Sequence, residues 1–223
     1  MKNIVVTNKN AIHRLSMYRS ALYRFKALGF KKIFSDYLAD AVEGNSAQVR
    51  KDFSLFGITG NKRGGYIIDA LLDKLNMILG KNRIQKVILA GAGNLGSALL
   101  KYAHFEKEGI KIEAAFDIDP AKHNLKGPVP VYPLDKLEPF VRDNGIKTAI
   151  LCVPDMAAQS IFELMLKAGI RGVLNFAPIR LKAPDECVVS HVNLAIELEN
   201  LIYFVNASEQ SDYGASPSPA ANS

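Results

Sequence analysis

Residues 86–100 read KVILAGAGNLGSALL, a pattern from which the fold of the larger part of the chain follows. A short apolar strand that turns through Gly-x-Gly-x-x-Gly into a helix is the fingerprint of a dinucleotide-binding domain. In such a loop Gly91 makes the tight turn, Gly93 lets the backbone approach a pyrophosphate, and Gly96 allows the helix to pack closely on the strand. The loop residues expected to contact the dinucleotide are Gly91, Ala92, Gly93, Asn94, Leu95 and Gly96.

The next apolar run, KIEAAFDID at 111–119, predicts a second strand with an acid at its end, after a helix over SALLKYAHF (97–105). Asp117 lies 26 residues after Gly91. A carboxylate there can accept hydrogen bonds from the ribose hydroxyls of an adenosine and would repel a 2′-phosphate. The pattern therefore favours NAD(H) over NADP(H), with Ile118 beside the acid. A capping or solvated role for Asp117 is the alternative.

Strands and helices continue to alternate as far as residue 178. Strands are expected over 129–132, 147–154 and 172–178, and helices over 134–145 and 155–169. This alternation predicts a doubly wound parallel sheet, in which ligands bind at the carboxyl ends of the strands. The further residues so placed are Val153, Pro154, Asn175, Phe176, Ala177 and Pro178.

These strand-end residues are apolar or uncharged. An apolar site should disfavour the positively charged nicotinamide ring of NAD⁺ relative to the neutral ring of NADH, because removing a charge from water is costly. A hundredfold preference needs only about 2.7 kcal/mol. The sequence thus predicts a site that takes both NADH and NAD⁺ and distinguishes between them.

The first eighty residues predict a different domain. Leu15, Leu22, Phe25 and Leu28 recur at helical spacing in residues 14–28, and Gly29 follows as a C-terminal cap. After a β-like FKKIF (30–34), Ser35 can cap a helix over 36–42, and the turn EGN (43–45) leads to a third helix opened by Ser46. Two short helices joined by a tight turn are typical of a helix-turn-helix domain.

The third helix, AQVRKDFSLF at 47–56, has two distinct faces. Val49, Phe53 and Phe56 form an inward stripe. Ala47, Lys51 and Ser54 lie opposite, flanked by Gln48 and Arg50. Such a face suits the major groove, where Gln pairs with adenine and Arg or Lys with guanine or phosphate. A merely solvated face is the alternative.

The segment GITGNKRGGYI (57–67) puts two cations at the tip of a glycine-bounded excursion, as expected of a β-wing. A long amphipathic helix over 66–80 and a linker over 81–83 follow. The residues expected to contact DNA in this domain are Ser46, Gln48, Arg50, Lys51, Ser54, Lys62 and Arg63.

The distribution of charge agrees with this division. Residues 1–83 hold 15 Lys and Arg against 6 Asp and Glu, a net +9, whereas the remainder carries −3 of the total of +6. A basic block next to an acidic one suggests that one domain meets a polyanion, although a solvated or membrane-surface patch would also explain it. No stretch approaches eighteen apolar residues, and residues 1–3 lead into a polar segment, so we expect a cytoplasmic protein.

The sequence contains no convincing set of catalytic residues. Tyr132 and Lys136 have the YxxxK spacing of some dehydrogenases, but Pro133 separates them from a shared helical face. Cys152 and Cys187 have no CxxC or metal-ligand partner nearby and are interpreted as buried hydrophobes. We therefore expect no catalytic residues, no metal and no enzyme activity. An NAD-dependent oxidoreductase, or a nucleotide- or CoA-binding regulatory module without DNA affinity, is the alternative.

Four motifs in order carry a family resemblance: NSAQVRKDFSLFG (45–57), GAGNLG (91–96), FDIDP (116–120) and GIRGVLNFAP (169–178). Over roughly residues 12–206 the chain resembles the Rex family of redox-sensing transcriptional repressors. The resemblance implies a repressor that binds operator DNA when NAD⁺ predominates and releases it when NADH binds. A palindromic duplex and a second copy of the chain are the partners it implies.

The same resemblance implies that the last helix, LAIELENLIYFV at 194–205, is swapped onto the partner subunit near its nucleotide site. It assigns Arg14, Tyr102 and Asn193 to the conformational switch. Two positions depart from the family pattern. The family usually has aspartate where this chain has Asn193, and the wing reads NKRGGY where the family usually has a glycine, one residue and a glycine before the tyrosine.

The fold class expected is α/β, with a winged helix-turn-helix domain, a Rossmann-like doubly wound parallel sheet and a C-terminal swapped helix. Expected bounds are 1–83 for the DNA-binding domain (helix-turn-helix 18–57, wing 58–67), 84–190 for the NAD(H)-binding domain, 191–206 for the swapped helix and 207–223 for a disordered tail.

Overall fold

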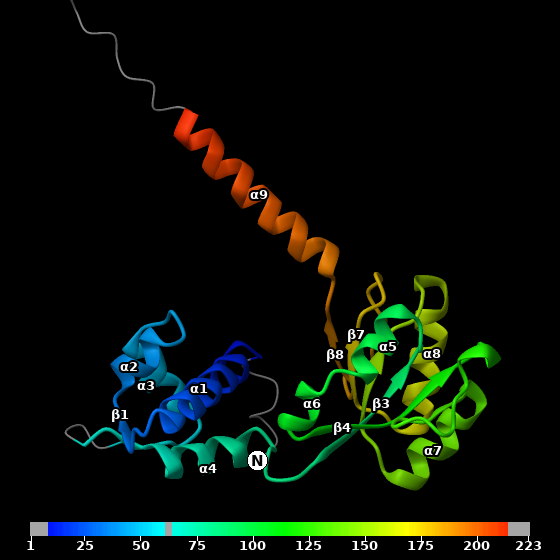
Figure 1. Cartoon of the computed structure of the whole chain (residues 1–223), viewed down its shortest axis with the longest axis horizontal. Coiled ribbons are helices and arrows are strands. Elements are labelled where there is room, and N and C mark those ends of the chain that lie inside the picture. The colour runs from blue at the N-terminus through cyan, green and yellow to red at the C-terminus, as the bar shows by residue number, and fades with distance from the viewer. Residues whose placement is uncertain (1–8, 61–63, 214–223) are drawn as a thin grey trace, which may run out of the picture. The chain divides into compact units, whose positions relative to one another are not determined.

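The computed structural model describes residues 9–60 and 64–213. The chain divides into two compact units, residues 1–85 and 86–223. Each unit is described by itself below, and Figure 1 labels most of the elements of both. We refer to residues 1–85 as the head domain and to residues 86–223 as the sheet domain.

The head domain consists of four helices and a two-stranded sheet within its described part. Strand β1, Lys32–Ile33, pairs antiparallel with β2, Tyr66–Ile67, so that Lys32 faces Ile67. The short β-like segment predicted before the second helix is thereby confirmed as a strand. The long helix expected over 66–80 is shorter than predicted, because Tyr66 and Ile67 pair with β1 and α4 begins only at Ile68. The helices of the head domain are α1 Lys9–Ala27, α2 Ser35–Asp40, α3 Ser46–Leu55 and α4 Ile68–Ile78.

The core of the head domain is built from one face of each long helix. Leu15 and Leu22 of α1, Phe53 of α3 and Leu75 of α4 are fully buried in one apolar cluster. The helical spacing that predicted this packing holds for Leu15 and Leu22. It is wrong for Leu28, which lies beyond the end of α1 and is 73% exposed.

Two predicted helix caps are off by one residue. Asn45, not Ser46, caps α3, and its side chain accepts a hydrogen bond from the backbone N–H of Gln48. Ser35 is the first residue of α2 rather than its cap, and its hydroxyl accepts from the Arg50 guanidinium instead. Serine and asparagine compete for the same capping position, and the extended backbone of Asn45 decides in its favour.

The sheet domain contains a six-stranded sheet with strand order β5-β4-β3-β6-β7-β8. The pairs β4–β5, β3–β6, β6–β7 and β7–β8 are parallel. The chain builds outward from β3 on one side and then from β6 on the other, so the predicted doubly wound sheet is confirmed. The strands are β3 Gln85–Ala90, β4 Ile110–Asp117, β5 Val131–Pro133, β6 Thr148–Leu151, β7 Gly172–Asn175 and β8 Val188–His191.

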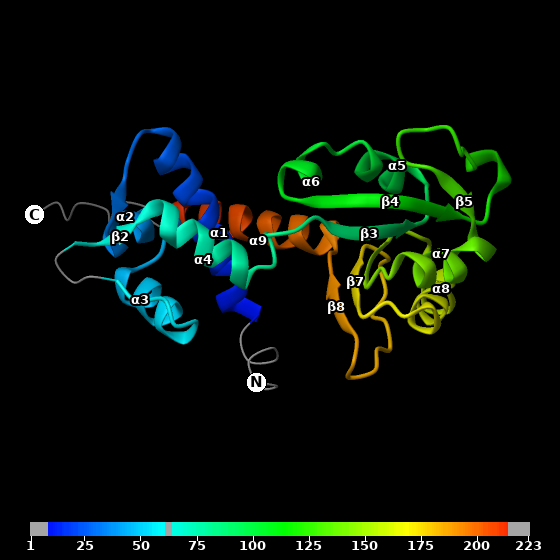
Figure 2. The same ribbon diagram turned by 90° about the horizontal axis from the view of Figure 1, so that it is seen from below.

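Helices cover both faces of this sheet, as Figure 2 shows. Alternate residues of β3 enter different cores: Ile88 joins the cluster that packs against α7 and α8, and Leu89 joins the one that contains Leu99 of α5 and Phe105 of α6. Strands buried on both faces explain the near-continuous apolar runs of the sequence. These helices are α5 Asn94–Leu100, α6 His104–Lys107, α7 Leu137–Asn144 and α8 Asp155–Ala168, with short 3₁₀ turns at Pro120–Lys122 and Leu134–Lys136.

Two helix predictions for this domain need correction. The single helix expected over 97–105 is instead two, because α5 begins earlier, at Asn94, and ends at Leu100, and α6 turns the Phe105 ring into the core. The last helix, α9, spans Leu194–Tyr213 and so runs into the segment expected to be disordered. Residues 207–213 read ASEQSDY, without the Gly and Pro that follow, so a helix can continue through them.

Candidate functional site

The glycine loop between β3 and α5 leaves no room for side chains at two of its positions. Gly91 has a φ of +95°, and a Cβ there would collide with the Cys152 carbonyl. A Cβ at Gly96 would collide with the Gly91 carbonyl. At Gly93, the residue before α5, a Cβ would meet nothing within 4 Å, so this side of the loop is open to a ligand. This is the cradle that a pyrophosphate requires.

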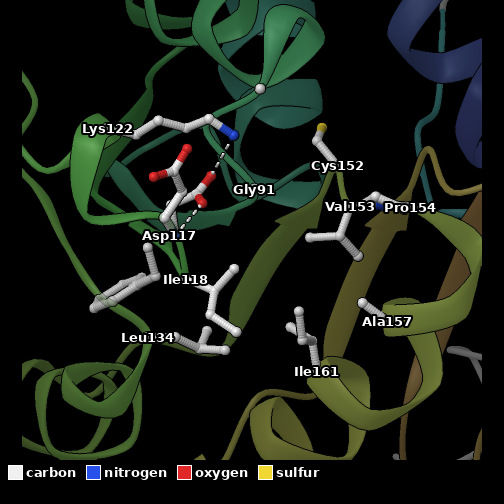
Figure 3. Close-up of a pocket in the computed structure, with 13 residues that line it drawn as sticks. Gly91, Asp117, Ile118, Lys122, Leu134, Cys152, Val153, Pro154, Ala157 and Ile161 are labelled. Carbon is white, nitrogen blue, oxygen red and sulfur yellow. Dashed lines mark hydrogen bonds and ion pairs between the residues drawn. The ribbon is translucent and has the colours of Figure 1, made fainter.

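A cavity of about 390 Å³ opens beside this loop, at the carboxyl ends of β3, β4 and β6 (Figure 3). This is where the strand order reverses, the place at which doubly wound sheets bind ligands. Gly91, Asp117, Ile118, Val153 and Pro154, all expected at the site, line it. Ala92, Asn94, Leu95 and Gly96 belong to the adjoining loop and helix start and are not among the lining residues.

Several lining residues escaped sequence reasoning. Leu134 follows β5, and Ala157 and Ile161 lie one turn apart on α8, so all three add apolar wall. The carboxyl-end rule applied to β5 would have indicated Leu134. Cys152 also lines the cavity, and burial raises the pKa of its thiol to about 12. The thiol is therefore protonated and unreactive at neutral pH.

Asp117 ends β4 and is only 6% exposed. One carboxylate oxygen accepts from the backbone N–H of Ala92 at 2.7 Å, and the other accepts from that of Asp119 at 2.9 Å. The acid thus ties the glycine loop to the end of β4 while it faces the cavity (Figure 3). The solvated role considered for Asp117 is wrong, because the side chain is buried, but binding backbone N–H groups and facing a ligand both fit this geometry.

A cation stands next to this acid. The ammonium of Lys122 lies 3.5 Å from the Asp117 carboxylate and also lines the cavity (Figure 3). The turn Pro120–Lys122, capped by the Asp119 side chain, places it there. Sequence reasoning missed Lys122, whose only local signal is the short turn sequence after the acid.

The segment 175–178 was expected to line the same cavity, but none of its residues does so. Asn175 is fully buried; its amide oxygen accepts from Ala177 N–H, and its Nδ2 lies 2.9 Å from the Ile179 carbonyl and 3.0 Å from His191 Nδ1. Phe176 packs in the core on the α5 side of the sheet. Ala177 and Pro178 line a second hollow of about 300 Å³, together with Asn193 at the start of α9. Asn175 therefore shapes a loop rather than the first cavity.

In the head domain, α3 presents the outer face expected of it. Lys51 and Ser54 are exposed, as is Arg50. The Arg50 guanidinium donates to the Ser35 hydroxyl at 3.0 Å and lies 3.9 Å from Asp36, and these contacts connect α3 with α2. Ser46 and Gln48 are half-buried at the start of the helix. Lys62 and Arg63, the expected wing cations, lie outside the described residues.

A buried ion pair behind this face was not foreseen. Asp52 of α3 is 2% exposed, and Arg14 of α1 donates to both of its oxygens, at 2.6 and 2.7 Å. Tyr18 adds a hydrogen bond of 2.9 Å, and burial together with this bond raises the tyrosine pKa to about 12. Burial opposes ionisation of Asp52, but the hydrogen bonds from Arg14, Gln48 and Tyr18 outweigh it and lower the pKa of the carboxyl.

The three residues assigned to the switch have different surroundings. Arg14 is bound to Asp52 inside the head domain. Tyr102, between α5 and α6, is 52% exposed and packs edge to face against Phe105. Asn193 caps α9, because its side-chain oxygen accepts from the backbone N–H groups of Ala195 and Ile196.

Within residues 9–60 and 64–213, no helix is long and apolar enough to cross a membrane. The same residues contain no group of three or more His, Cys, Asp or Glu side chains placed to hold a metal ion.

Two protein families match parts of the chain. Residues 8–54 match the family described as putative DNA-binding protein N-terminus, and residues 82–179 match the family described as CoA binding domain. The first match covers α1 to α3, and the second covers the sheet from β3 to β7 with the cavity.

Three solved structures match nearly the whole chain. A crystal structure of RSP, described as a Rex-family repressor, has a TM-score of 0.84 at 32% identity and covers 95% of this chain and 100% of that one. RSP with β-NADH gives a TM-score of 0.82 at 33% identity, over 94% and 99% of the two chains. RSP with β-NAD⁺ and operator DNA gives 0.87 at 33% identity, over 96% and 100%.

Curated relatives are more similar still in sequence. The redox-sensing transcriptional repressor Rex of Bacillus subtilis (strain 168) is 44% identical over 193 residues, which are 86% of this chain and 89% of the relative. Rex of Listeria welshimeri is 40% identical over 193 residues, 86% and 90% of the two chains. With both domains and nearly the whole length matched, the chain belongs to the Rex family of redox-sensing transcriptional repressors.

Proposed function

We propose that this protein is a transcriptional repressor that binds operator DNA through its head domain and senses the NADH/NAD⁺ balance in its sheet domain. One observation carries the proposal: a single chain combines a dinucleotide cradle, with Gly93 open and Asp117 beside it, and a helix-turn-helix whose α3 exposes Lys51 and Ser54. RSP, whose structures contain β-NADH or β-NAD⁺ with operator DNA, supports both halves.

In the sheet domain, the open side of the loop at Gly93 would admit the pyrophosphate of the dinucleotide. Asp117 would accept hydrogen bonds from the adenosine ribose, since each of its oxygens can accept more than the one backbone bond it has. Ile118, Val153 and Ile161 supply apolar walls that exclude water. Such walls favour the neutral nicotinamide of NADH over the cationic ring of NAD⁺.

In the head domain, α3 would enter the major groove with Lys51 and Ser54 outward, and Arg50 would hold phosphate. Ser46 and Gln48, at the N-terminal end of the helix, would then face the base edges. We keep Lys62 and Arg63 as proposed wing contacts on the sequence alone.

We further propose that the repressor is a homodimer on a palindromic operator and that α9 joins the subunits. Leu194, Leu198, Leu201 and Val205 form a stripe at spacings of four, three and four residues, and each is between 48% and 63% exposed. An apolar stripe of this length exposed on a helix calls for a partner. Tyr102, Asn193 and Arg14 are the residues proposed to couple the nucleotide to DNA release.

We propose a sensor rather than an enzyme, acting in the cytoplasm. In favour of sensing, Tyr132, half of the dehydrogenase-like YxxxK spacing, packs against Phe116 and Phe140, and Lys136 lies in the separate 3₁₀ turn Leu134–Lys136. Family membership also supports regulation, because the curated relatives are named repressors.

The test is a fluorescence titration of a labelled palindromic duplex with the full chain, with and without NADH. We expect tight binding that NADH reverses and NAD⁺ does not. Hydride turnover with an alcohol or carbonyl substrate would favour the oxidoreductase. Failure to bind any duplex, while NADH still binds, would favour a regulatory module without DNA affinity.

A further inference from the structure

Gln48 is held at two points. It is the third residue of α3, in the part of a recognition helix that faces base edges. Its backbone N–H donates to the Asn45 side chain at 2.8 Å. Its side-chain Nε2 donates to Asp52 at 2.8 Å. A half-buried side chain anchored in this way has lost much of the freedom of an exposed glutamine.

The hydrogen-bond acceptor sites of the Asp52 carboxylate are in turn all occupied. Its two oxygens accept four hydrogen bonds: two from Arg14, one from Tyr18 and one from Gln48. A carboxylate offers about four acceptor sites, so nothing is left over. The bonds hold the pKa of Asp52 below its usual value, and the group is therefore an ionised, acceptor-only partner at neutral pH.

This environment fixes the orientation of the Gln48 amide, that is, which of its two polar atoms faces Asp52. An amide beside a carboxylate must turn its NH₂ toward it, because a flipped amide would place oxygen against oxygen. The Oε1 atom is then on the other side of the amide group, away from the Asp52 carboxylate. One hydrogen of Nε2 is used by Asp52, and the second is still available.

We propose that Asp52 is a positioning residue that makes Gln48 a directional reader of the major groove. This inference rests on the proposed DNA-binding function. With its orientation fixed, Gln48 accepts from an exocyclic amine through Oε1. Adenine suits it best, because N6 donates to Oε1 and N7 takes the second Nε2 hydrogen, and cytosine N4 satisfies only the first contact. Guanine O6 and thymine O4 would face Oε1 as acceptor against acceptor.

The first experiment measures base preference with the full chain. A palindromic operator is selected from a pool of randomised duplexes, and affinities are then measured for duplexes that carry each base at each half-site position. In the wild type one position should prefer adenine, then cytosine. Gln48→Met, similar in size but without hydrogen-bonding groups, should reduce that preference about tenfold or more and leave the other positions unchanged.

The second experiment separates positioning from mere stability. Asp52→Asn removes the acceptor-only partner, so the Gln48 amide can flip, and guanine or thymine should come within about threefold of adenine at the same position. Tyr18→Phe removes one of the four bonds but keeps the carboxylate. It should lower thermal stability without changing the base preference.

Each outcome decides the matter. The inference is overturned if Gln48→Met keeps every preference, if Asp52→Asn keeps the adenine preference, or if Tyr18→Phe broadens it as much. Should Asp52→Asn not fold, the NMR order parameter of the wild-type Gln48 side-chain amide replaces it: a value above about 0.6 supports an anchored amide, and one below about 0.6 overturns the inference. A wild type that selects no sequence contradicts DNA binding itself, a result distinct from all of these.

Discussion

The guanidinium of Arg14 on α1 binds the carboxylate of Asp52 on α3 through Nε–Oδ2 at 2.6 Å and Nη2–Oδ1 at 2.7 Å. The two residues are 38 positions apart in the chain. The side chain of Arg14 is 27% exposed and that of Asp52 is 2% exposed, so the carboxylate is the buried partner. This pair fastens the first helix of the head domain to the helix proposed to read DNA.

Removing the cation should therefore destabilise the head domain. Arg14→Ala leaves Asp52 buried without its counter-charge, and we expect a loss of about 3 kcal/mol in the free energy of unfolding, measured by denaturant titration at neutral pH. The pKa of Asp52 is lowered by folding, so the stabilisation is complete above its unfolded pKa of about 3.9 and is lost as pH falls through the folded pKa. The difference between wild type and variant should hence shrink below about pH 4.

Lys26→Ala is the matched control for Arg14→Ala. It breaks an ion pair with Asp69 in which both side chains are more than half exposed, and solvent screening should make the loss of stability much smaller than in Arg14→Ala. Equal losses in the two variants would show that the Arg14–Asp52 pair contributes no more than a surface contact.

Lys51→Ala and Arg50→Ala should weaken operator binding and leave NADH binding unchanged, because α3 and the glycine loop belong to different units of the chain. If Lys51 contacts a phosphate, its removal should also lower the salt dependence of binding by about one unit of slope. Titrations at several salt concentrations measure both effects, with Lys26→Ala as a head-domain control. Unchanged affinity in both α3 variants would remove this helix from the DNA interface.

Asp117→Ala should weaken NADH binding and relax discrimination against NADPH, because the charge that repels a 2′-phosphate is lost. In the wild type, the Lys122 ammonium lies 3.5 Å from the Asp117 carboxylate. Once that carboxylate is removed, Lys122 should attract the 2′-phosphate further. Competition titrations of NADH fluorescence with NADPH measure the ratio. Lys122→Ala should change it in the opposite direction. If NADPH already competes as well as NADH in the wild type, Asp117 does not discriminate.

The exposed stripe on α9 predicts the oligomeric state. Leu201→Glu places a charge in the stripe, and we expect the dimer to dissociate, as seen by analytical ultracentrifugation at micromolar concentration. Operator affinity should fall with it, because two half-sites are no longer bound together. Glu199→Lys also changes a charge on α9, but at a position that does not belong to the stripe, and is the control. A dimer that persists in Leu201→Glu would place the subunit interface elsewhere.

Asn193→Asp restores the residue usual in the family. Asn193 caps α9 through its side-chain oxygen, and aspartate caps equally well, so folding should not be disturbed. If position 193 meets Arg14 in the DNA-bound form, a charge-assisted bond replaces a neutral one about half as strong. Asp52 uses two of the five Arg14 donors, and others are left for such a contact.

We therefore expect Asn193→Asp to strengthen operator binding and to raise the NADH concentration needed for release. The two values should move together, because one conformational equilibrium underlies both. Operator affinity and half-release are measured at one salt concentration, with Asn193→Ser as an uncharged capping control. Weaker DNA binding, or no change in either value, would take Asn193 out of the switch.

The sequence by itself determined those features whose cause is local. The periodicity of residues 14–28 and 47–56, the glycine spacing of 91–96 and the acid at Asp117 each act over a few residues, and the structure confirms the helices, the loop and the buried strand end. The sequence does not determine the exact helix boundaries, since Asn45 and Ser46 are both good caps and only the backbone conformation selects Asn45.

Tertiary structure alone decided the rest. In the sequence, Asp52 is not distinguishable from other polar residues of a helix. Only the fold brings Arg14, 38 positions away, into contact with it. Asn175 lies at a strand end like Val153, yet its amide is used by Ile179 and His191 on neighbouring segments, and it turns away from the cavity. A buried polar group must find its partners wherever the fold supplies them, and no local pattern records which distant segment will do so.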